Sequence, residues 1–353
     1  MSLEMLEIEA PRADEVLVRL TAVGICHTDI VMRDQLFPVP QPIVLGHEGA
    51  GVIEAVGSEV AGLAVGDHVV MSYAWCGGEC TQCKSGNYTY CERSFALNFG
   101  GARMDGSTSL SCGTEKVHSH FFGQSSFAEY ALCSARHAVK VPKDAPLELL
   151  APLGCGVSTG SGAVINALKV KAGESIAVFG VGSVGLSAVM AARLVGAATI
   201  IAIDVNPQRL ALAQELGATH IVNASTQEPA AAIREVLPGG VQFALDTTAR
   251  PDTIRTAITS LSPRGTCGLL GASAPTDVVS FSPMDVMSFG KSVRGIVEGD
   301  AVPAIMIPQL VELHRQGRFP FDKLVKFYPF EAINEAIHDS ETGKTVKPIL
   351  RMK

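Results

Sequence analysis

The sequence predicts an α/β protein in two parts, a β-rich first part and a doubly wound parallel sheet after it. Up to about residue 155, short apolar runs are broken by Gly, Pro and Asp and alternate as strands do. From Ser175 onward, strand-like runs alternate with helix-like stretches. Because this rhythm requires right-handed crossovers, it predicts a parallel sheet with helices on both faces.

Composition and charge exclude several classes of function. The chain has 353 residues, enough for two domains, with 47% hydrophobic and 18% charged residues. This balance disfavours disorder. The net charge of −7 is spread along the chain without a long basic run, so nucleic acid and anionic membrane surfaces are poor partners. No window approaches the roughly 20 uninterrupted apolar residues of a membrane span.

The nine cysteines indicate a reducing compartment. Their number is odd, and the opening "MSLEMLEIEAPRADEVLVRL" has acids where a secretion signal carries positive charge. We therefore expect a cytoplasmic protein in which disulfides are disfavoured and metal ligation gains weight.

The elements follow in order along the chain. In the first part the predicted strands are "DEVLVRLTAVGI", "GAGVIEAVG", "GDHVVMSYA" and "SFAEYALCS", with a turn of helix after Cys26. In the second part "SIAVFG", "TIIAID", "HIVN", "FALDTTA" and "TCGLLGA" are strands, and "SVGLSAVMAARLVG", "NPQRLALAQELGA" and "PDTIRTAITSLSPRG" are helices. A further helix around "PAIMIPQLVELHRQG" precedes the tail. The predicted domains are residues 1–156, residues 157–296, and a C-terminal segment, 297–353, that returns to the first domain.

The stretch "GVGSVG" predicts a dinucleotide site. It follows a strand and opens a helix, which is the context that the G-x-G-x-x-G pattern needs. Gly180 permits the tight turn, Gly182 lets the backbone approach a pyrophosphate, and Gly185 lets helix and strand pack closely. Val184 lies in the same turn and is assigned to this site. The helix N-terminus then favours the negative charge of the phosphates.

Asp204 ends the next strand, nineteen residues after Gly185. A carboxylate there accepts hydrogen bonds from the adenosine ribose and repels a 2′-phosphate. The sequence therefore favours NAD over NADP. The alternative is a glycine-rich turn with an unrelated surface acid.

A four-cysteine segment at residues 76–91 predicts a first metal site. Four thiolates in a glycine-containing loop can enclose one tetrahedral zinc and leave no position for substrate, so a zinc site here is structural. An iron–sulfur centre held by the same thiolates is the alternative. The residues are Cys76, Cys80, Cys83 and Cys91.

A second set of donors comes from three distant stretches. "GICHTD" contains Cys26, "GHEGAG" contains His47 with Glu48, and "PLGCG" contains Cys155. Two thiolates and one imidazole leave a fourth position open, as a catalytic zinc requires. Asp29 can orient His47 through its second ring nitrogen. By contrast, His68, Cys112, Cys133 and Cys267 have no partner pattern and are interpreted as structural.

Together these motifs resemble the zinc-dependent medium-chain alcohol dehydrogenases over nearly the whole chain. Within that family the chain is most similar to bacterial aryl-alcohol and allylic-alcohol dehydrogenases, of the benzyl alcohol and geraniol type. The stretches "LNFGG", "FFGQSSFAEYA" and "PLELLAPLGCG" carry the narrower likeness. The resemblance implies a GroES-like catalytic domain and a Rossmann domain, with the active site in the cleft between them. It also implies a homodimer or homotetramer, because the final Rossmann strands of relatives usually pair across subunits.

The resemblance also implies a role for individual residues. Cys26, His47 and Cys155 match the ligands of the catalytic zinc, and the four cysteines of 76–91 match the structural zinc. Glu48 matches a carboxylate that approaches the metal during exchange, and Thr28 matches the hydroxyl that bonds the substrate oxygen. The remaining matches are His27 beside the cofactor phosphates, Arg209 beside the adenosine and Asp204 on the ribose.

Two departures from the family pattern affect these expectations. The lobe usually runs C-x-x-C-x-x-C, whereas three residues separate Cys76 from Cys80 here, which puts zinc binding in the lobe in doubt. Many relatives carry a His five residues after the first zinc cysteine, as part of a proton relay. Val31 occupies that position, so the proton must leave by another route.

The implied reaction is the reversible oxidation of a primary aromatic or allylic alcohol to its aldehyde, with hydride transfer to NAD. Thr28 would carry the hydroxyl proton away, and Tyr73, Trp75 and Phe121 would wall an apolar pocket. Each of these aromatic residues could equally be a core residue.

Three alternative functions would use part of the same fold and site. A zinc polyol or glutathione-dependent formaldehyde dehydrogenase would have the same metal with a polar pocket. A zinc-free quinone reductase would not need Cys26, His47 and Cys155. A non-enzymatic redox sensor would bind NAD and zinc without turnover.

Overall fold

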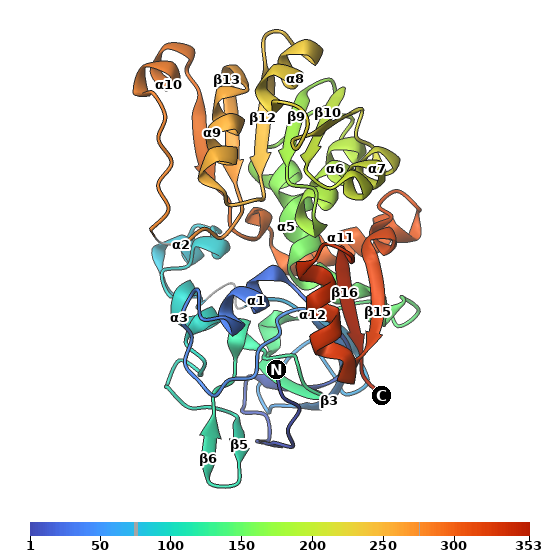
Figure 1. Cartoon of the computed structure of the whole chain (residues 1–353). Helices are drawn as coiled ribbons and strands as arrows, with labels where there is room; N and C mark the ends of the chain where they lie inside the picture. Colours follow the sequence, from blue (N-terminus) through green and yellow to red (C-terminus); the bar gives the residue numbers. More distant parts are fainter. Residues whose placement is uncertain (74–76, 275) are drawn as a thin grey trace. The chain divides into compact units, whose positions relative to one another are not determined.

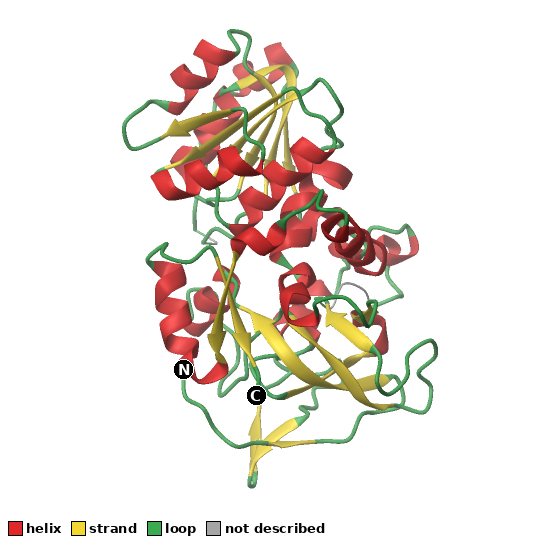
Figure 2. Cartoon of the chain, turned by 90° about the vertical axis from the view of Figure 1, so that its right-hand side faces the viewer, coloured by secondary structure: helices red, strands yellow, loops and turns green. Residues whose placement is uncertain are grey.

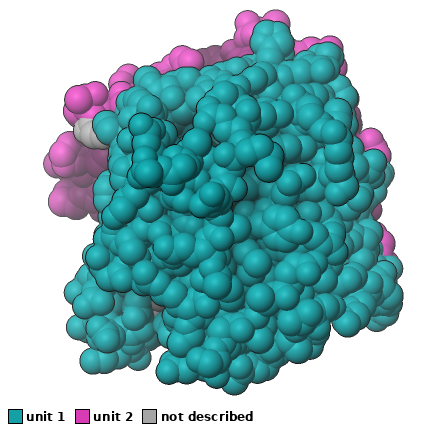
Figure 3. All heavy atoms as spheres, turned by 90° about the horizontal axis from the view of Figure 1, so that it is seen from below, with its two compact units in different colours: residues 1–155, 302–315, 321–353 teal, residues 156–301, 316–320 magenta. Residues whose placement is uncertain are grey.

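The chain folds as two compact units, which Figure 3 shows in different colours. The computed structural model describes residues 1–73, 77–274 and 276–353. Unit 1 comprises residues 1–155, 302–315 and 321–353, and unit 2 comprises residues 156–301 and 316–320. Unit 1 is therefore assembled from both ends of the chain.

Unit 1 is built on a seven-stranded sheet with the order β15-β16-β2-β3-β4-β8, in which β7 also pairs with β2 (Figure 2). Except for the parallel pair β15 and β16, its neighbouring strands are antiparallel. A smaller sheet, β1-β5-β6, includes the hairpin at the bottom of Figure 1. The strands are β1 (Glu7–Ile8), β2 (Glu15–Gly24), β3 (Gly49–Val56), β4 (His68–Met71), β5 (Leu110–Cys112), β6 (Glu115–Val117), β7 (Tyr130–Ser134), β8 (Ala138–Lys140), β15 (Val325–Pro329) and β16 (Lys347–Arg351).

The helices of unit 1 are mostly short. The helix after Cys26 and the one that begins at Pro303 were predicted from the sequence, but the four other α-helices of this unit were not. Helices of one or two turns leave too weak a periodic pattern to detect. They are α1 (His27–Arg33), α2 (Thr81–Lys84), α3 (Ser94–Phe99), α4 (Leu147–Leu150), α11 (Pro303–Arg315) and α12 (Ile333–Glu341).

Unit 2 is a six-stranded parallel sheet with the order β11-β10-β9-β12-β13-β14. The inner strands β9 and β10 run as near-continuous apolar segments, because helices cover both faces of the sheet (Figure 1). The strands are β9 (Ser175–Phe179), β10 (Thr199–Asp204), β11 (His220–Asn223), β12 (Val241–Asp246), β13 (Leu261–Leu269) and β14 (Ser292–Gly295). The helices are α5 (Gly156–Gly162), α6 (Ser183–Leu194), α7 (Pro207–Leu216), α8 (Pro229–Val236), α9 (Pro251–Thr259) and α10 (Pro283–Phe289).

The strand order reverses between β9 and β12. The chain runs outward from β9 through β10 to β11 and then returns to β12, so the carboxyl ends of β9 and β12 flank a switch point. In open α/β sheets this is where ligands bind. The predicted doubly wound parallel sheet is therefore confirmed, and the glycine turn after β9 lies at its switch point.

One predicted helix is too long. Sequence analysis extended the helix after Pro251 to Gly265, but α9 ends at Thr259 and β13 already begins at Leu261. Pro263 cannot continue a helix, and Arg264 has a positive φ of 64°. Helices α5, α8 and α10 were not predicted at all. No helix among the described residues has both the length and the apolar character needed to cross a bilayer.

A buried ion pair fixes the start of β2 to the segment before β5. Arg103 donates to Glu15 through Nε at 2.6 Å and through Nη2 at 3.0 Å, and both side chains are about 7% exposed. His120 Nε2 lies 3.6 Å from the same carboxylate. Burial alone would raise the pKa of Glu15, but the contacts with His120 and Arg103 lower it well below its usual range.

Replacing Arg103 by Met is expected to lower the free energy of unfolding at pH 7 by about 3–5 kcal/mol, because it leaves the buried Glu15 carboxylate uncompensated. In the wild type the folded-state pKa of Glu15 is depressed. Its stabilisation is therefore fully present above the unfolded value of 4.5 and is lost progressively as the pH falls from there toward the lower folded-state pKa. Urea unfolding from pH 7 to pH 3 should show the difference in stability between variant and wild type narrowing below about pH 4.5.

Arg12→Met is the matched control, since Arg12 pairs with the exposed Asp105. It should cost less than about 1 kcal/mol. An equal loss of unfolding free energy in the two variants would contradict the larger contribution of the buried ion pair.

Candidate functional site

Cys26 lies in the turn between β2 and α1. β2 ends at Gly24 and α1 begins at His27, so the thiol stands just before the first helical turn. Thr28 follows within that turn, and its Oγ1 lies 3.7 Å from Cys26 Sγ. A hydroxyl is thus held beside the thiol, where it can exchange a proton with a ligand at that position.

The carboxylate of Asp29 ties together the first two ligand segments. Asp29 is fully buried; its Oδ2 accepts from Cys26 N at 3.0 Å, and its Oδ1 accepts from Gly46 N at 3.1 Å. The same Oδ1 lies 2.8 Å from His47 Nδ1. This contact fixes the orientation of the imidazole and leaves Nε2 free for another partner. His47 Nε2 is buried and has no hydrogen-bond partner.

Cys155 comes from the segment that ends unit 1. Gly154 lets this segment pass close to β4, because a Cβ at that position would lie only 2.3 Å from the carbonyl oxygen of Met71. The side-chain donors of Cys26, His47, Glu48 and Cys155 all lie within 4.8 Å of one another. The structure therefore brings together the three segments from which the sequence predicted ligands.

These donors fit a zinc ion. A hydrogen bond from Cys155 lowers the pKa of Cys26 well below its usual value, against the effect of burial, and the His47 imidazole adds to this effect. A half-buried thiol with a lowered pKa beside an imidazole nitrogen without a partner is the donor chemistry that zinc prefers. Two thiolates and one imidazole leave a coordination position open for a reacting molecule.

Lys347, in β16, was not predicted from the sequence as a residue of the site. Its Nζ donates to both carboxylate oxygens of Glu48 at 2.8 Å and to Ile25 O at 3.1 Å. These three bonds use all three protons of the ammonium group. Burial would lower the pKa of Lys347, but Glu48 and Cys26 raise it well above the usual value. The signal available in the sequence was a single lysine within the apolar run "TVKPIL".

The pairing restrains the carboxylate of Glu48. Burial raises the pKa of Glu48, while Lys347 opposes that rise. Gly24 is required for the arrangement, because a Cβ there would lie 2.0 Å from Glu48 Oε2. Glu48 is thus held within reach of the ligand cluster, with its charge balanced by Lys347.

The described cysteines of the lobe also cluster. Cys80 Sγ lies 3.4 Å from Cys83 Sγ and 3.9 Å from Cys91 Sγ. Hydrogen bonds from the backbone N–H groups of Cys83 and Glu92 lower the pKa of Cys80 to about 7. Three clustered thiols, one of which has a lowered pKa, are suitable ligands for zinc. Cys76, the fourth predicted ligand, lies outside the described residues.

The glycine turn after β9 has the geometry of a phosphate-binding turn. Gly180 has a φ of 84°, and a Cβ there would meet Thr247 at 2.6 Å. A Cβ on Gly182 would meet nothing within 4 Å, which leaves space for a ligand against the backbone. A Cβ on Gly185 would lie 1.9 Å from Gly180 O, so the helix could not pack there. Each glycine therefore has its own steric requirement.

Polar groups surround this turn. Asp204 accepts from Val181 N at 2.7 Å and from Asn206 N at 2.9 Å, which places its carboxylate beside the glycine turn. Ser183 Oγ and Arg209 Nε are buried and have no hydrogen-bond partner. Such groups fit the phosphates and the ribose of a dinucleotide. Val184 is half-buried in the first turn of α6.

Aromatic rings line one side of the His47 ligand. Phe122 stacks on the imidazole with ring centres 4.3 Å apart, and Phe121 meets its edge at 5.7 Å. Phe121 is fully buried and Tyr73 is 5% exposed. Sequence analysis named Tyr73 and Phe121 as pocket walls but missed Phe122. Trp75 lies outside the described residues.

The other predicted positions are more exposed or isolated. His27 is exposed at the start of α1, and His68 begins β4. Burial raises the pKa of Cys267 to about 12, consistent with a packed thiol. Cys133 is also buried, whereas Cys112 is exposed.

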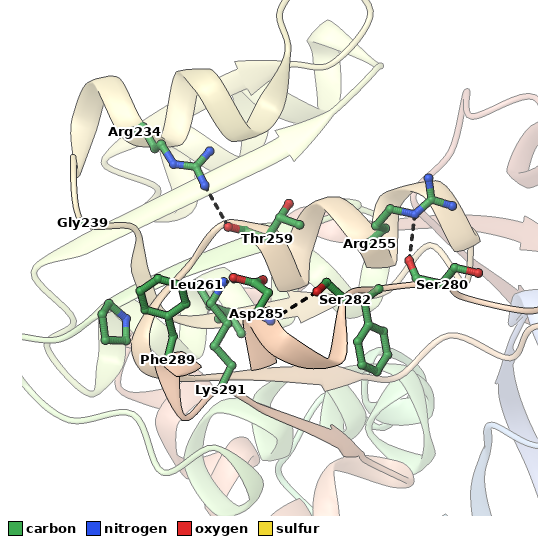
Figure 4. Close-up of a pocket in the computed structure, with 12 residues that line it drawn as sticks. Arg234, Gly239, Arg255, Thr259, Leu261, Ser280, Ser282, Asp285, Phe289 and Lys291 are labelled. Carbon is green, nitrogen blue, oxygen red and sulfur yellow. Dashed lines mark hydrogen bonds and ion pairs between the residues drawn. The ribbon is translucent and has the colours of Figure 1, made fainter. Parts of the chain in front are cut away.

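A separate pocket of about 840 Å³ lies at the amino ends of strands β12 and β13 (Figure 4). Its basic residues have structural partners: Arg234 donates to Thr259 O at 3.0 Å, and Lys291 donates to Ile258 O at 3.4 Å. Both therefore satisfy carbonyl groups at the C-terminal end of α9. The pocket lies at the amino ends of the strands, whereas the glycine turn follows the carboxyl end of β9. The pocket is therefore not the dinucleotide site.

Two family models match the chain. The alcohol dehydrogenase GroES-like domain matches residues 12–143, and the zinc-binding dehydrogenase model matches residues 183–314. Geraniol dehydrogenase from Castellaniella defragrans is 48% identical over 352 residues, which cover 99% of this chain and 94% of that protein.

Solved structures of alcohol dehydrogenases also match the chain over its whole length. A zinc-binding domain protein of the alcohol dehydrogenases from Burkholderia ambifaria is 57% identical with a TM-score of 0.97; the match covers 100% of this chain and 95% of that one. Benzyl alcohol dehydrogenase from Acinetobacter calcoaceticus is 50% identical with a TM-score of 0.97; the match covers 100% of this chain and 96% of that one.

Replacing Lys347 by Met is expected to lower the free energy of unfolding by about 3–5 kcal/mol, because it leaves the Glu48 carboxylate buried without its cation. The double variant Lys347→Met/Glu48→Gln removes both charges and should recover most of that loss. Urea unfolding of the wild type, the single variants and the double variant measures the coupling. Additive losses would contradict the pairing.

Proposed function

The chain belongs to the zinc-dependent alcohol dehydrogenase family, and on this premise we propose that it oxidises primary aromatic or allylic alcohols, such as benzyl alcohol and geraniol, to their aldehydes with NAD. The observation that carries the substrate proposal is the aromatic wall against His47, formed by Phe121 and Phe122. The names of two relatives, geraniol dehydrogenase and benzyl alcohol dehydrogenase, support the same substrates.

The aromatic wall continues away from the metal ligands. Phe99 lies 5.1 Å from Phe122 and 5.2 Å from Phe37, and Phe95 closes the group at 5.3 Å from Phe37. These rings make the surroundings of His47 apolar and offer a polyol no hydrogen-bond partners. We therefore favour an apolar alcohol over the sugar alcohols and glutathione adducts of the alternative dehydrogenases.

Cys26, His47 and Cys155 are the proposed ligands of the catalytic zinc. When bound, zinc supplies Lewis acidity at the alcohol oxygen, and the oxidised nicotinamide supplies the hydride acceptor. Thr28 takes up the hydroxyl proton at Oγ1 and passes its own proton to solvent water. Asp29 keeps His47 in the tautomer that presents Nε2.

Glu48 has a separate proposed role. Its carboxylate lies within the ligand cluster and is available during exchange of water or product. Lys347 controls how far it can move, since both of its oxygens are bound to Nζ. The proposed proton route avoids Val31, whose side chain has no group that titrates or donates.

We propose NAD rather than NADP as the cofactor. Asp204 is directed by two backbone N–H groups, and a carboxylate in that position repels a 2′-phosphate. The proposed cofactor residues are Gly180, Gly182, Val184, Gly185, Asp204 and Arg209, with His27 toward the phosphates.

We propose a second, structural zinc in the cysteine lobe. Cys80, Cys83 and Cys91 already cluster, and Cys76 is assigned as the fourth ligand. Because both zinc sites need reduced thiols, the cytoplasm is the proposed location.

We propose that the chain forms a homo-oligomer through the β14 edge of unit 2. All four residues of β14 are exposed, and α10 presents exposed apolar side chains, including Met284, Met287 and Phe289. An open strand beside an apolar helix is suited to pairing with a second copy. Light scattering of the wild type against Met287→Lys tests it, and a monomeric wild type would contradict it.

Steady-state oxidation should show a higher kcat/KM for benzyl alcohol, geraniol and cinnamyl alcohol than for ethanol, sorbitol or hydroxymethylglutathione. The aromatic wall gives the reason for this order, and reduced nicotinamide absorbance is the measurement. Cys155→Ala should abolish the activity, while Cys112→Ala, at an exposed thiol, should keep it. A preference for sorbitol or the glutathione adduct would contradict the proposal of an apolar substrate. Zinc and NAD binding without turnover of any alcohol would favour the redox sensor.

Replacing Asp204 by Ala should raise the KM for NAD roughly tenfold for each ribose hydrogen bond that is lost. It should also reduce the discrimination against NADP, because the repelling charge is gone. The ratio of kcat/KM for NAD and NADP in the two proteins is the measurement. Asp252→Ala, an exposed acid in the same unit, is the control. A wild type that uses both cofactors equally would contradict this assignment.

A further inference from the structure

The amide of Gln124 is buried and fully hydrogen-bonded beside the proposed catalytic zinc ligands. The residue is 2% exposed. Its Nε2 donates to His47 O at 3.0 Å and to Ser72 O at 3.2 Å, and its Oε1 accepts from Gly49 N at 3.1 Å. A flipped amide would place a donor against a donor and lose all three contacts, so the side chain has one orientation.

These three bonds take the place of strand pairing. The antiparallel ladder between β3 and β4 ends at the pair Ala50 and Val70. Beyond it, Ser72 N continues the pairing of β4 with β8 by bonding to His137 O, while Gly49 N on the β3 side bonds to Gln124 Oε1. The Gln124 amide fills the gap, bonding the N–H that begins β3, the carbonyl of the metal ligand and the carbonyl that follows β4. The backbone on both sides of Glu48 is thereby fixed.

Gln124 belongs to a loop that contacts His47 twice. Phe122 of the same loop stacks on the imidazole of His47, and Gln124 binds its main chain. The loop has a strained backbone, with positive φ values at His120, Phe122 and Ser125. Surrounding bonds over-determine that conformation: Ser125 Oγ accepts from Phe121 N at 2.9 Å and donates to Val44 O at 2.5 Å.

The loop also runs along the segment that leads to His47. Ser126 N donates to Gly46 O and Phe127 N donates to Leu45 O, each at 2.9 Å. Gly46 is tightly enclosed, since a Cβ there would lie 2.4 Å from Phe127 N. Main-chain hydrogen bonds therefore hold the residues before His47. The Gln124 side chain holds the peptide groups that follow it.

We propose that Gln124 is a positioning residue that aims His47 Nε2 at the catalytic metal by fixing the peptide groups on either side of Glu48. This inference rests on the zinc site proposed above. Asp29 fixes the direction in which the imidazole ring of His47 points. Gln124 fixes the position of the backbone that carries the ring. Both are needed, because a metal ligand must be fixed in position as well as in direction.

The test compares Gln124→Met, Gln124→Glu and the control Tyr328→Phe with the wild type. Met has a similar length but leaves three buried backbone groups unsatisfied. Glu keeps the acceptor for Gly49 N but, when ionised, cannot donate to the two carbonyls. Tyr328→Phe removes a buried hydroxyl of unit 1 that bonds Asp339 at 2.7 Å and Thr345 at 2.8 Å, so it also loses buried hydrogen bonds.

The readouts are the rate at which zinc is lost to a chromogenic chelator and the visible spectrum of the cobalt-loaded protein. Gln124→Met should lose zinc roughly 10–100-fold faster than the wild type and shift the cobalt bands. Gln124→Glu should change both in the same direction, and Tyr328→Phe should change neither, although its thermal midpoint falls. The cysteine lobe is identical in all four proteins, so the differences report on the other site.

Wild-type zinc retention and an unchanged cobalt spectrum in Gln124→Met would overturn the proposal, whatever the loss of stability. If that variant does not fold, Gln124→Glu decides by the same two readouts. A wild type that retains no zinc beyond the lobe would contradict the metal site itself. A wild type that retains zinc but oxidises no alcohol would contradict the proposed function, while the zinc-loss rates would still decide the role of Gln124.

Discussion

The proposed metal site depends on the hydrogen bonds that the buried carboxylate of Asp29 accepts. It accepts hydrogen bonds from the backbone of Cys26 and Gly46 and orients His47, so one side chain joins two ligand segments. A buried carboxylate is costly unless its lone pairs are satisfied, and here three polar groups surround it. The same bonds that compensate its burial therefore also fix the ligand geometry.

The region around the proposed ligands is closed by charge pairing and small residues rather than by apolar packing alone. Lys347 neutralises Glu48, Gly24 leaves room for the Glu48 side chain, and Gly154 lets its segment approach the Met71 carbonyl. Such a site is tightly specified, because a larger residue at Gly24 would displace Glu48 and one at Gly154 would displace the segment that carries Cys155. In unit 2, Gly180 and Gly185 fulfil the same requirement where helix, strand and cofactor turn meet.

The sequence predicted the local features of the site well. Cys26 and Asp29 are three residues apart, and the glycine turn and Asp204 occupy fixed places in a strand–helix–strand unit, so spacing alone was informative. Lys347 was missed because its partner Glu48 lies 299 residues away and no periodic pattern connects them. Gln124 and Phe122 were missed because their contacts depend on left-handed backbone that non-glycine residues seldom adopt. The end of α9 was misplaced because apolar spacing does not register the helix-breaking effect of Pro263.

The position of β16 in the sheet of unit 1 has a consequence for biosynthesis. β16 lies between β15 and β2 and carries Lys347, yet the ribosome makes it after unit 2 and nearly all the rest of the chain. Until it emerges, residues 22–24 of β2 lack the strand that pairs with them, and Glu48 has not yet met Lys347. All of residues 156–301 of unit 2 are made by then, whereas unit 1 still lacks one of its inner strands. The thiols of unit 1 are therefore most exposed to oxidation and to capture of the wrong metal in the interval before β16 joins the sheet.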